Sequence, residues 1–457
     1  MLISLRRTAV LVPALALLAS AASVSIAPAT HAAITGNFGS PLAIETWAVP
    51  SGDSGLIEAT QGPDFGQGGI VSWNGAVWFA EENAGKIGRI DTAGTITEYD
   101  VPDGAGAPGY GPRQLTAATS GQLWFLADGG ALDGRAAWMD PAGVTQALFN
   151  FPGYVEFSSL AATPDGGAWL SYGDGEDITR LDATAEETAF FDEPEYYADV
   201  ESTLGPDGAL WYSDGSNRIE RITESGSLTT YPATGDNGEI VSMTTSGGNI
   251  WYAQFSPGSL FVRSYDGIVA KMSTSGIPTP FPSPYPDLLP AGLTPASDGG
   301  VWFTTHHGAG IGHVSPAGQY QVALLPDGYA ADSVTQGPDG NLWFTDADLN
   351  RIGRVTIAAF NAAIASQGGG AGLTIAPKAK VKAGKAVLRA TCTTTTACTG
   401  KLAAKLKKKT LAKGKYAVGA GATKKVKLRL TKAGRAYFRA HRKAKVVVAG
   451  QRIVLRR

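Results

Sequence analysis

PDGNLWFTD at residues 338–346, followed by RIGRV at residues 351–355, contains the pattern that decides the fold. Its Trp belongs to a series of seven, which are Trp78, Trp124, Trp169, Trp211, Trp251, Trp302 and Trp343. The intervals between them are 46, 45, 42, 40, 51 and 41 residues. A period of about forty residues predicts an array of structural repeats.

Each repeat has the composition of four short β-strands. Pro-Asp-Gly is a tight-turn sequence, because Pro fixes φ while Asp and Gly suit the later turn positions. Around it lie short runs rich in β-branched and aromatic residues, such as ITEY at residues 96–99, with Gly, Asn and Asp between them. Such runs are typical of strands. Four strands per repeat predict a propeller blade, and seven repeats predict an all-β, seven-bladed β-propeller over residues 43–357.

The two ends of the repeat array are incomplete in complementary ways. No fourth strand follows Val355 in the last repeat, whereas IETWAVP at residues 44–50 resembles the fourth strand of repeat one, ITEYDVP at residues 96–102. We expect residues 43–50 to complete blade seven, because closing the ring removes two unpaired sheet edges. The alternative is a solenoid that does not close.

The net charge of −2 conceals an uneven distribution. Residues 371–457 contain 25 Lys and Arg and no acidic residue, so the other 13 basic residues and all 40 acidic ones lie in residues 1–370, a balance of −27. This asymmetry predicts an electrostatic partner for at least one half. For the basic half we expect an anionic cell-wall polymer or another polyanion, or else the chain's own acidic propeller. Few aromatic residues lie there, which argues against sequence-specific nucleic-acid recognition.

The N-terminus has the pattern of an export signal. Arg6 and Arg7 precede an apolar stretch at residues 8–22, and small residues lead to a cleavage site after Ala32 or Ala33. This pattern predicts a signal peptide over residues 1–33 and a secreted or cell-surface location. An uncleaved anchor is the alternative.

The C-terminal part is predicted to be a separate domain. Residues 358–372 include the run SQGGG and are expected to form a flexible linker. Residues 373–457 alternate apolar residues with Lys or small residues, which predicts a small basic β-sandwich-like domain with one helix at residues 431–442. Cys392 and Cys398 are expected to form a disulfide if the chain is exported.

The blade motifs resemble those of the virginiamycin B lyase (streptogramin lyase) family. The similarity is clearest in NLWFTD at residues 341–346 and in VWFAE at residues 77–81 with KIGRI at residues 86–90. It covers about residues 43–357 and implies a seven-bladed propeller. It also implies a possible lyase that opens the ester of a cyclic depsipeptide by elimination, with a divalent metal, glutamates and histidines at the centre of the ring. Because one fold hosts many functions, activity has to be argued from the site.

Two positions depart from the pattern of the lyase. In the family, Pro-His-Gly-Ile-Thr commonly opens the first strand of a blade and can supply a catalytic His, whereas the nearest match here places Ala291 at that position. His307 lies two residues after the end of a Trp strand, where a family-type catalytic His could sit, but Thr305 replaces the Glu expected before it. We take His307 as the candidate catalytic residue. The alternative is that His307 belongs to a polar loop.

Carboxylates at one end of the ring are the candidate metal ligands. Glu81 and Asp346 end Trp strands in blades one and seven, which adjoin on closure, and Asp332 lies near them in the predicted ring. A hard cation such as Mg²⁺ prefers several oxygen ligands of this kind. Alternatively, each carboxylate accepts backbone N–H groups from the next loop. Further side chains expected at the channel mouth are Arg113, Tyr172, Asp214 and His306.

Three functional hypotheses follow. The first is an exported monomer that acts as a binding or scaffold module and takes a small-molecule or peptide-like ligand at the propeller channel, because Ala291 and Thr305 replace residues on which the lyase depends. The second is a metal-dependent carbon–oxygen lyase acting on a cyclic depsipeptide antibiotic or a related ester. The third is a polyanion-binding protein that acts through its basic C-terminal domain.

Overall fold

A computed structural model describes most of the chain. The described residues are 38, 40–56, 69–101, 111–128, 134–150, 157–172, 177–192, 201–213, 217–234, 238–256, 266–285, 288–305, 308–366, 373–376, 378–392, 398–407, 409–419, 422–448 and 451–457. The expected signal peptide at residues 1–33 lies outside them. None of the helices in these ranges is long and apolar enough to span a bilayer.

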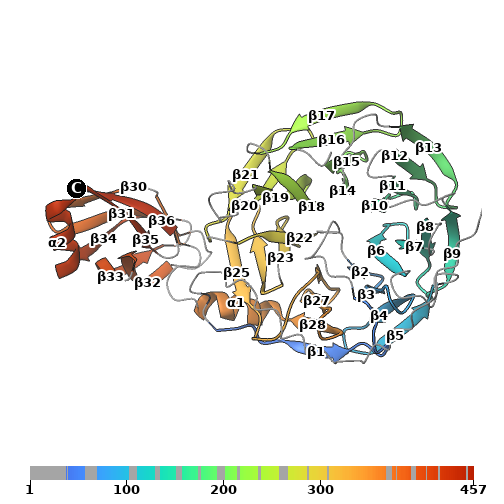
Figure 1. The fold of residues 1–457 in the computed structure, drawn as a ribbon, viewed down its shortest axis with the longest axis horizontal. Coiled ribbons are helices and arrows are strands. Elements are labelled where there is room, and N and C mark those ends of the chain that lie inside the picture. Colours follow the sequence, from blue (N-terminus) through green and yellow to red (C-terminus); the bar gives the residue numbers. More distant parts are fainter. Residues whose placement is uncertain are drawn as a thin grey trace, which may run out of the picture. The chain divides into compact units, whose positions relative to one another are not determined.

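Seven four-stranded antiparallel sheets follow one another around a ring in the described part of the chain (Figure 1). Blades one to three comprise β2 (Ile70–Trp73), β3 (Ala76–Glu81), β4 (Lys86–Ile90) and β5 (Ile96–Asp100); β6 (Pro112–Ala117), β7 (Leu123–Asp128), β8 (Gly134–Met139) and β9 (Thr145–Asn150); and β10 (Phe157–Ala162), β11 (Ala168–Tyr172), β12 (Asp177–Leu181) and β13 (Glu187–Asp192).

Blades four to six repeat this order. They comprise β14 (Ser202–Leu204), β15 (Leu210–Ser213), β16 (Arg218–Ile222) and β17 (Leu228–Pro232); β18 (Glu239–Ser246), β19 (Asn249–Ser256), β20 (Asp266–Met272) and β21 (Pro278–Pro282); and β22 (Pro290–Pro295), β23 (Val301–Thr305), β24 (Gly310–Val314) and β25 (Tyr320–Leu324). Blade seven contains β26 (Val334–Gln336), β27 (Leu342–Asp346) and β28 (Arg351–Val355). The predicted seven-bladed propeller is confirmed.

The N-terminal strand closes the ring, as the sequence predicts. β1 (Glu45–Ala48) pairs antiparallel with β28, and Trp47 lies opposite Ile352 in the register. The Trp47 ring stacks on Trp343 with centroids 5.2 Å apart and planes 20° from parallel. Blade seven therefore takes its outer strand, and the aromatic ring that covers its repeat Trp, from a segment about three hundred residues earlier in the chain.

The repeat tryptophans form the core between blades. Trp78 is completely buried and stacks on Tyr99 of its own outer strand, with ring centroids 5.4 Å apart. Gly143, in a turn of the next blade, also lies against the Tyr99 ring. Its φ is +82°, and a Cβ there would come within 2.0 Å of the Tyr99 ring. Glycine is therefore required at this turn both for its backbone conformation and for the close approach between blades.

Blade six departs from the repeat, and its neighbours compensate. Ala323 pairs with Ile311 where the other outer strands place an aromatic residue, so Trp302 lacks that partner. Phe360 packs edge-on against Trp302 instead, with centroids 5.0 Å apart. The His313 ring lies 4.5 Å from Trp302, and its Nε2 is 3.2 Å from Asp298 Oδ1. Burial lowers the pKa of His313 although Asp298 opposes this shift.

Phe360 belongs to helix α1 (Ile357–Ser366), which lies where a flexible linker was expected. The Thr356 hydroxyl accepts the Ala359 N–H at 3.0 Å at the N-terminus of the helix, and Phe360, Ala363 and Ile364 are buried. The linker prediction was therefore wrong for residues 358–366, because apolar residues at helical spacing pack on blade six. Residues 367–372 lie outside the described residues.

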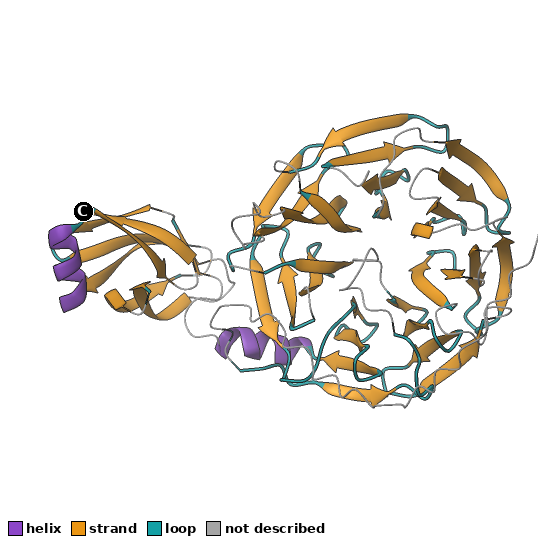
Figure 2. Ribbon diagram, viewed as in Figure 1, coloured by secondary structure: helices purple, strands orange, loops and turns teal. Residues whose placement is uncertain are grey.

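The C-terminal domain is a closed, barrel-like sheet with one helix, in agreement with the predicted sandwich-like β-domain (Figure 2). Its strand order is β29-β31-β30-β36-β35-β32-β33-β34, and pairing of β31 with β34 closes a ring of the seven strands β30 to β36. The elements are β29 (Leu373–Ile375), β30 (Lys378–Lys382), β31 (Lys385–Cys392), β32 (Cys398–Leu406), β33 (Lys409–Val418), β34 (Thr423–Leu430), α2 (Lys432–Ala440), β35 (Lys443–Val448) and β36 (Gln451–Arg456).

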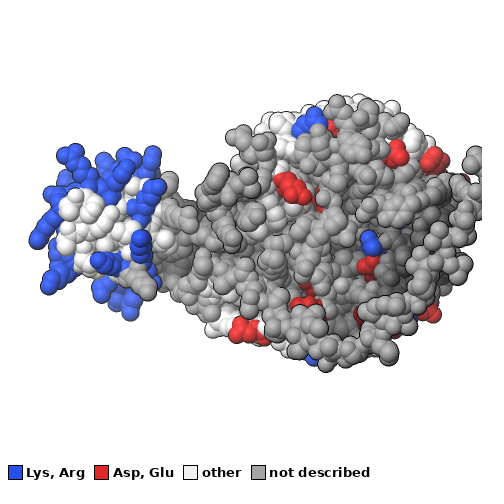
Figure 3. All heavy atoms as spheres, in the orientation of Figure 1, with Lys and Arg blue, Asp and Glu red and all other residues white. Residues whose placement is uncertain are grey.

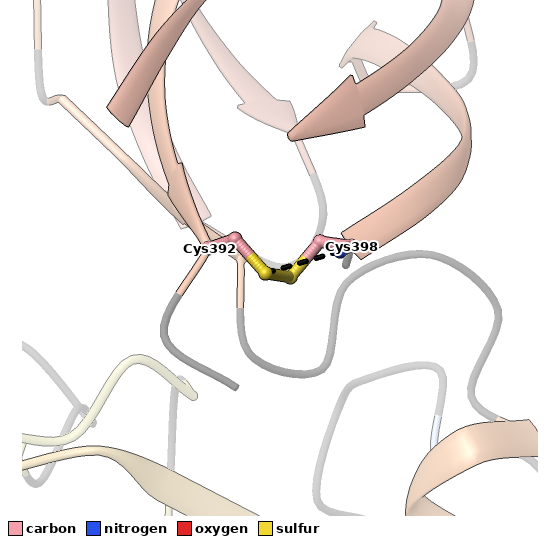
Figure 4. The surroundings of a disulfide bond; sticks show 2 residues. All are labelled: Cys392 and Cys398. Carbon is pink, nitrogen blue, oxygen red and sulfur yellow. Dashed lines mark hydrogen bonds between the residues drawn. A yellow bond between two sulfur atoms is a disulfide. The ribbon is translucent and has the colours of Figure 1, made fainter. Parts of the chain in front are cut away.

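Local chemistry supports the barrel at two places. The side chain of Thr431, the residue predicted to begin the helix, accepts the Gly434 N–H at 3.0 Å and caps α2. Cys392 and Cys398 form the expected disulfide, which joins the end of β31 to the start of β32 (Figure 4). The Cys398 N–H also donates to Cys392 Sγ at 3.1 Å.

Candidate functional site

A cavity of about 440 Å³ occupies the centre of the ring. The first strands of all seven blades line it, namely β2, β6, β10, β14, β18, β22 and β26. Its described lining combines aliphatic side chains with Ser and Thr hydroxyls and Gln336, and it includes no ionisable side chain. Such a surface suits a neutral ligand that is partly apolar and able to form hydrogen bonds.

The hydroxyl groups of this lining were not singled out from the sequence, although a signal was present. Five first strands each contribute a Thr to the lining of the cavity, namely Thr116, Thr203, Thr244, Thr294 and Thr335. Sequence reasoning placed the site at the strand ends, where charged residues occur. The structure instead gives a described cavity formed by uncharged residues of the first strands, mostly in their second halves.

Glu81 is not among the residues that line this cavity. It ends β3, is completely buried and lies over Gly88, where an added Cβ would come within 2.7 Å of its Oε1. Burial raises the pKa of Glu81 to about 8, and the neighbouring charge of Glu98 adds to this rise, whereas Ser51 and Lys86 oppose it. Glu98 itself accepts the Ser51 N–H at 2.8 Å and bonds Lys86 Nζ at 2.9 Å. Glu81 thus lies beside Ser51, in the segment that follows the closing strand β1.

Asp346 and Asp332 support the turn after β27. Asp346 is buried, and its Oδ1 accepts the Leu349 N–H at 3.2 Å. Burial raises the pKa of Asp346 to about 6, although backbone hydrogen bonds oppose this rise. Asp332 Oδ2 accepts the Ala347 N–H at 2.7 Å. These contacts are those of the alternative in which the carboxylates accept backbone N–H groups from a loop.

Glu81, Asp332 and Asp346 are not brought together as a metal site. Among the described residues, no three His, Cys, Asp or Glu side chains gather closely enough to hold a metal ion. A bound divalent cation therefore stays a prediction for this chain, and these three carboxylates do not gather as its ligands in the described structure.

The structure describes only some of the other candidate site residues. Arg113 lies on β6 and forms an ion pair with Glu82 at 2.9 Å, which joins blade two to the end of blade one. Tyr172 is the last residue of β11, and its side chain lies outside the described part of the structure. Asp214, His306 and His307 lie outside the described residues.

Both residues that depart from the lyase pattern, Ala291 and Thr305, lie in the described part of the structure. Ala291, near the start of β22, is completely buried opposite Thr304. Thr305, the last residue of β23, is also buried, and its hydroxyl accepts the Gly310 N–H at 3.0 Å. The methyl group of Ala291 cannot act as a base. The hydroxyl of Thr305 does not supply the negative charge of the Glu that it replaces.

Glu81→Gln is expected to flatten the pH dependence of stability between about pH 4.5 and 8. In this range Glu81 ionises in the unfolded chain but stays protonated in the folded protein, whose pKa for this group is about 8. The folded state then binds more protons, so the free energy of unfolding falls as pH rises, by a total on the order of a few kcal/mol.

Chemical denaturation at pH 5 and pH 8 measures this difference. Gln has a similar shape and does not titrate, so Glu81→Gln should lose less stability between the two pH values than the parent protein does. Glu186→Gln, on an exposed turn, is the matched control and should behave like the parent. An equal fall in all three proteins would contradict the assignment.

The ring of seven Trp-strand sheets around an uncharged channel defines this chain as a closed seven-bladed β-propeller with an appended basic β-domain. Residues 42–261 and 257–376 match the sequence pattern of the Virginiamycin B lyase family. Since these two matches together cover more than half of the chain, the chain belongs to that family.

Individual relatives agree with this assignment. A curated virginiamycin B lyase from Nocardia farcinica (strain IFM 10152) is 28% identical over 150 residues, which are 33% of this chain and 48% of the relative. The match thus spans about half the length of that relative. A streptogramin B lyase structure superimposes with a TM-score of 0.55 at 23% identity and covers 69% of this chain and 98% of its own.

A third comparison is with a structure that contains quinupristin. The crystal structure of a catalytically inactive virginiamycin B lyase from Staphylococcus aureus with quinupristin superimposes with a TM-score of 0.55 at 21% identity. It covers 69% of this chain and 99% of its own. At these identities the structural likeness establishes the fold.

Proposed function

We propose that this propeller is an exported binding or scaffold module of the virginiamycin B lyase family, which takes a small-molecule or peptide-like ligand at its channel and does not carry out the lyase reaction. The observation that carries the proposal is the pair of buried positions at the start of β22 and the end of β23. Ala291 and Thr305 occupy them, and Thr305 is bonded to Gly310.

The chemistry of elimination explains why these positions matter. A base must remove a proton from the carbon next to the one that carries the ester oxygen, the C–O bond then breaks, and a carboxylate leaves. Developing negative charge on the leaving oxygen needs a cation or a set of preorganised donors. Neither Ala291 nor Thr305 supplies a base or a carboxylate that would hold such a cation. Binding requires none of these groups.

The channel supports the binding part of the proposal. Its described lining is uncharged, has about 440 Å³ of space and alternates hydroxyl with aliphatic groups. A cyclic peptide or depsipeptide is neutral over most of its surface, exposes amide donors and acceptors, and carries apolar side chains. Both kinds of group would find partners at such a surface.

Titration calorimetry with a type B streptogramin as the probe tests this proposal. Thr294→Val and Thr335→Val remove hydroxyls from the channel while keeping the side-chain shape, and each is expected to weaken binding about tenfold, the typical effect of a hydrogen bond left unmade. Thr97→Val, on the exposed outer strand β5, is the matched control and should bind as the parent does. Equal affinity in all four proteins, or no binding by the parent, would reject a channel site for this class of ligand.

A further inference from the structure

The outer surface of the C-terminal barrel is densely cationic (Figure 3). Every Lys and Arg from residue 378 onward whose side chain is described is exposed, while most of the intervening apolar side chains are buried in the core of the barrel. Residues 371–457 contain no Asp or Glu, so the domain has no carboxylate side chain of its own to neutralise these cations.

Strand pairing aligns four of these cations in one row. Lys382 of β30 lies opposite Lys385 of β31. Lys385 lies opposite Arg429 of β34 on the other side of its strand, and Arg429 lies opposite Lys413 of β33. Neighbouring strands are about 4.8 Å apart, so the row crosses four strands with one positive charge on each.

A second row begins beside the first. Lys380 is two residues before Lys382 on β30, and its side chain therefore leaves the same face of the sheet. Lys380 is paired with Arg456 of β36, which is in turn paired with Lys443 of β35. Together the two rows cross six of the seven strands of the barrel, and we call them the cation girdle.

The girdle is unfavourable for the isolated domain. Like charges directly opposite each other on neighbouring strands destabilise a sheet, by roughly 0.2–1 kcal/mol for each pair. The two rows contain five such pairs, counted from their registers. A bound polyanion would convert each repulsion into an attraction, and it would release counterions as it bound.

We propose that the cation girdle binds a flexible, base-free phosphodiester polymer, such as a polyol phosphate chain. A phosphodiester has two non-bridging oxygens, so two neighbouring cations of a row can share one phosphate. The girdle runs around a closed barrel, and a flexible chain can follow this curvature. A DNA duplex, with a persistence length of about 50 nm, would touch it along one line.

The barrel exposes few aromatic and apolar side chains, and this favours a base-free polymer over nucleic acids and over a membrane surface. Tyr416 and Phe438 are buried, and Tyr437 stacks on His441 with centroids 4.2 Å apart. Little aromatic surface is therefore left on the described barrel for stacking of nucleic-acid bases. Val447 is the one large apolar side chain exposed on the described part of the barrel, so a membrane surface would gain little from insertion.

The test compares two triple variants of the full mature chain, with fluorescently labelled poly(glycerol phosphate) as the probe. Lys382→Gln, Lys385→Gln and Arg429→Gln together remove three neighbours from the girdle. Lys405→Gln, Lys432→Gln and Arg439→Gln remove the same charge from exposed positions outside it. The girdle variant should lose at least tenfold in affinity and about 2 in the slope of log affinity against log salt, and the control should lose less than threefold.

Melting curves separate binding from folding, because removal of like-charge pairs should leave the girdle variant at least as stable as the parent. Equal losses in the two variants would overturn the girdle as the binding surface. Tighter binding to duplex DNA or to phosphatidylglycerol vesicles than to poly(glycerol phosphate) would overturn the choice of polymer. Failure of the full chain to bind the polymer at low salt would overturn the proposal in favour of neutralisation by the chain's own acidic propeller.

Discussion

Deletion of residues 34–50 from the chain that begins at residue 34 is expected to lower its melting temperature by on the order of 10 °C or more and to cause aggregation. The deletion removes β1, so the edge of β28 loses its partner strand. It also removes Trp47. Trp343, which is completely buried in the intact protein, then loses the ring that stacks on it.

The same segment contacts other blades before it reaches blade seven. Phe38 packs on Tyr285 with ring centroids 5.3 Å apart, and the Leu42 N–H donates to the Leu324 carbonyl of blade six at 2.9 Å. Calorimetry and sedimentation of the chain that begins at residue 34, compared with the chain that begins at residue 51, measure the effect. A truncated protein that stays monomeric and melts like the longer one would show that the strand does not stabilise the ring.

Trp211→Ala is expected to reduce the free energy of unfolding by roughly 3–5 kcal/mol, the range found when large aromatic residues are truncated in cores. The Trp211 side chain is completely buried and stacks on Tyr231 with centroids 5.3 Å apart. Its Nε1 donates to Asp207 Oδ1 at 3.0 Å, so the substitution also removes a hydrogen bond.

Urea denaturation of Trp211→Ala and of a matched variant measures this loss. Phe190→Ala removes an aromatic ring that is 48% exposed on β13, and it should cost less than about 1 kcal/mol. If Trp211→Ala kept its stability but lost binding of the streptogramin probe, the repeat tryptophans would belong to a binding site and not to the core.

The repeat pattern predicted the fold because its features perform the same local task in most blades. The buried Trp recurs in all seven blades, an aromatic residue occupies the equivalent position of the outer strand in six, and closure was visible in the likeness of residues 44–50 to residues 96–102. Helix α1 was missed because its role is specific to blade six. Phe360 fills a space that exists because Ala323 replaces an aromatic residue, and no repeat pattern contains that information.

The candidate site was predicted less well, for a geometric reason. Side chains along a strand alternate between the two faces of its sheet, and in a propeller both faces of a blade pack on neighbouring blades. A carboxylate at the end of a Trp strand can therefore be buried against a face of its blade, as Glu81 is over Gly88, and need not line the channel. The lining of the described channel comes from the first strands. Their Ser and Thr residues were not predicted as site residues because the prediction relied on ionisable side chains.

Incubation of the chain that begins at residue 34 with a type B streptogramin and Mg²⁺, followed by liquid chromatography with tandem mass spectrometry, tests most directly whether the lyase reaction is absent. Ring opening by elimination gives a linear isomer of unchanged mass, which separates by retention time and fragments from a free carboxyl end. The cyclic antibiotic should be recovered intact. Accumulation of the linear isomer over many turnovers, abolished by His307→Ala, would contradict this prediction and identify the protein as a lyase.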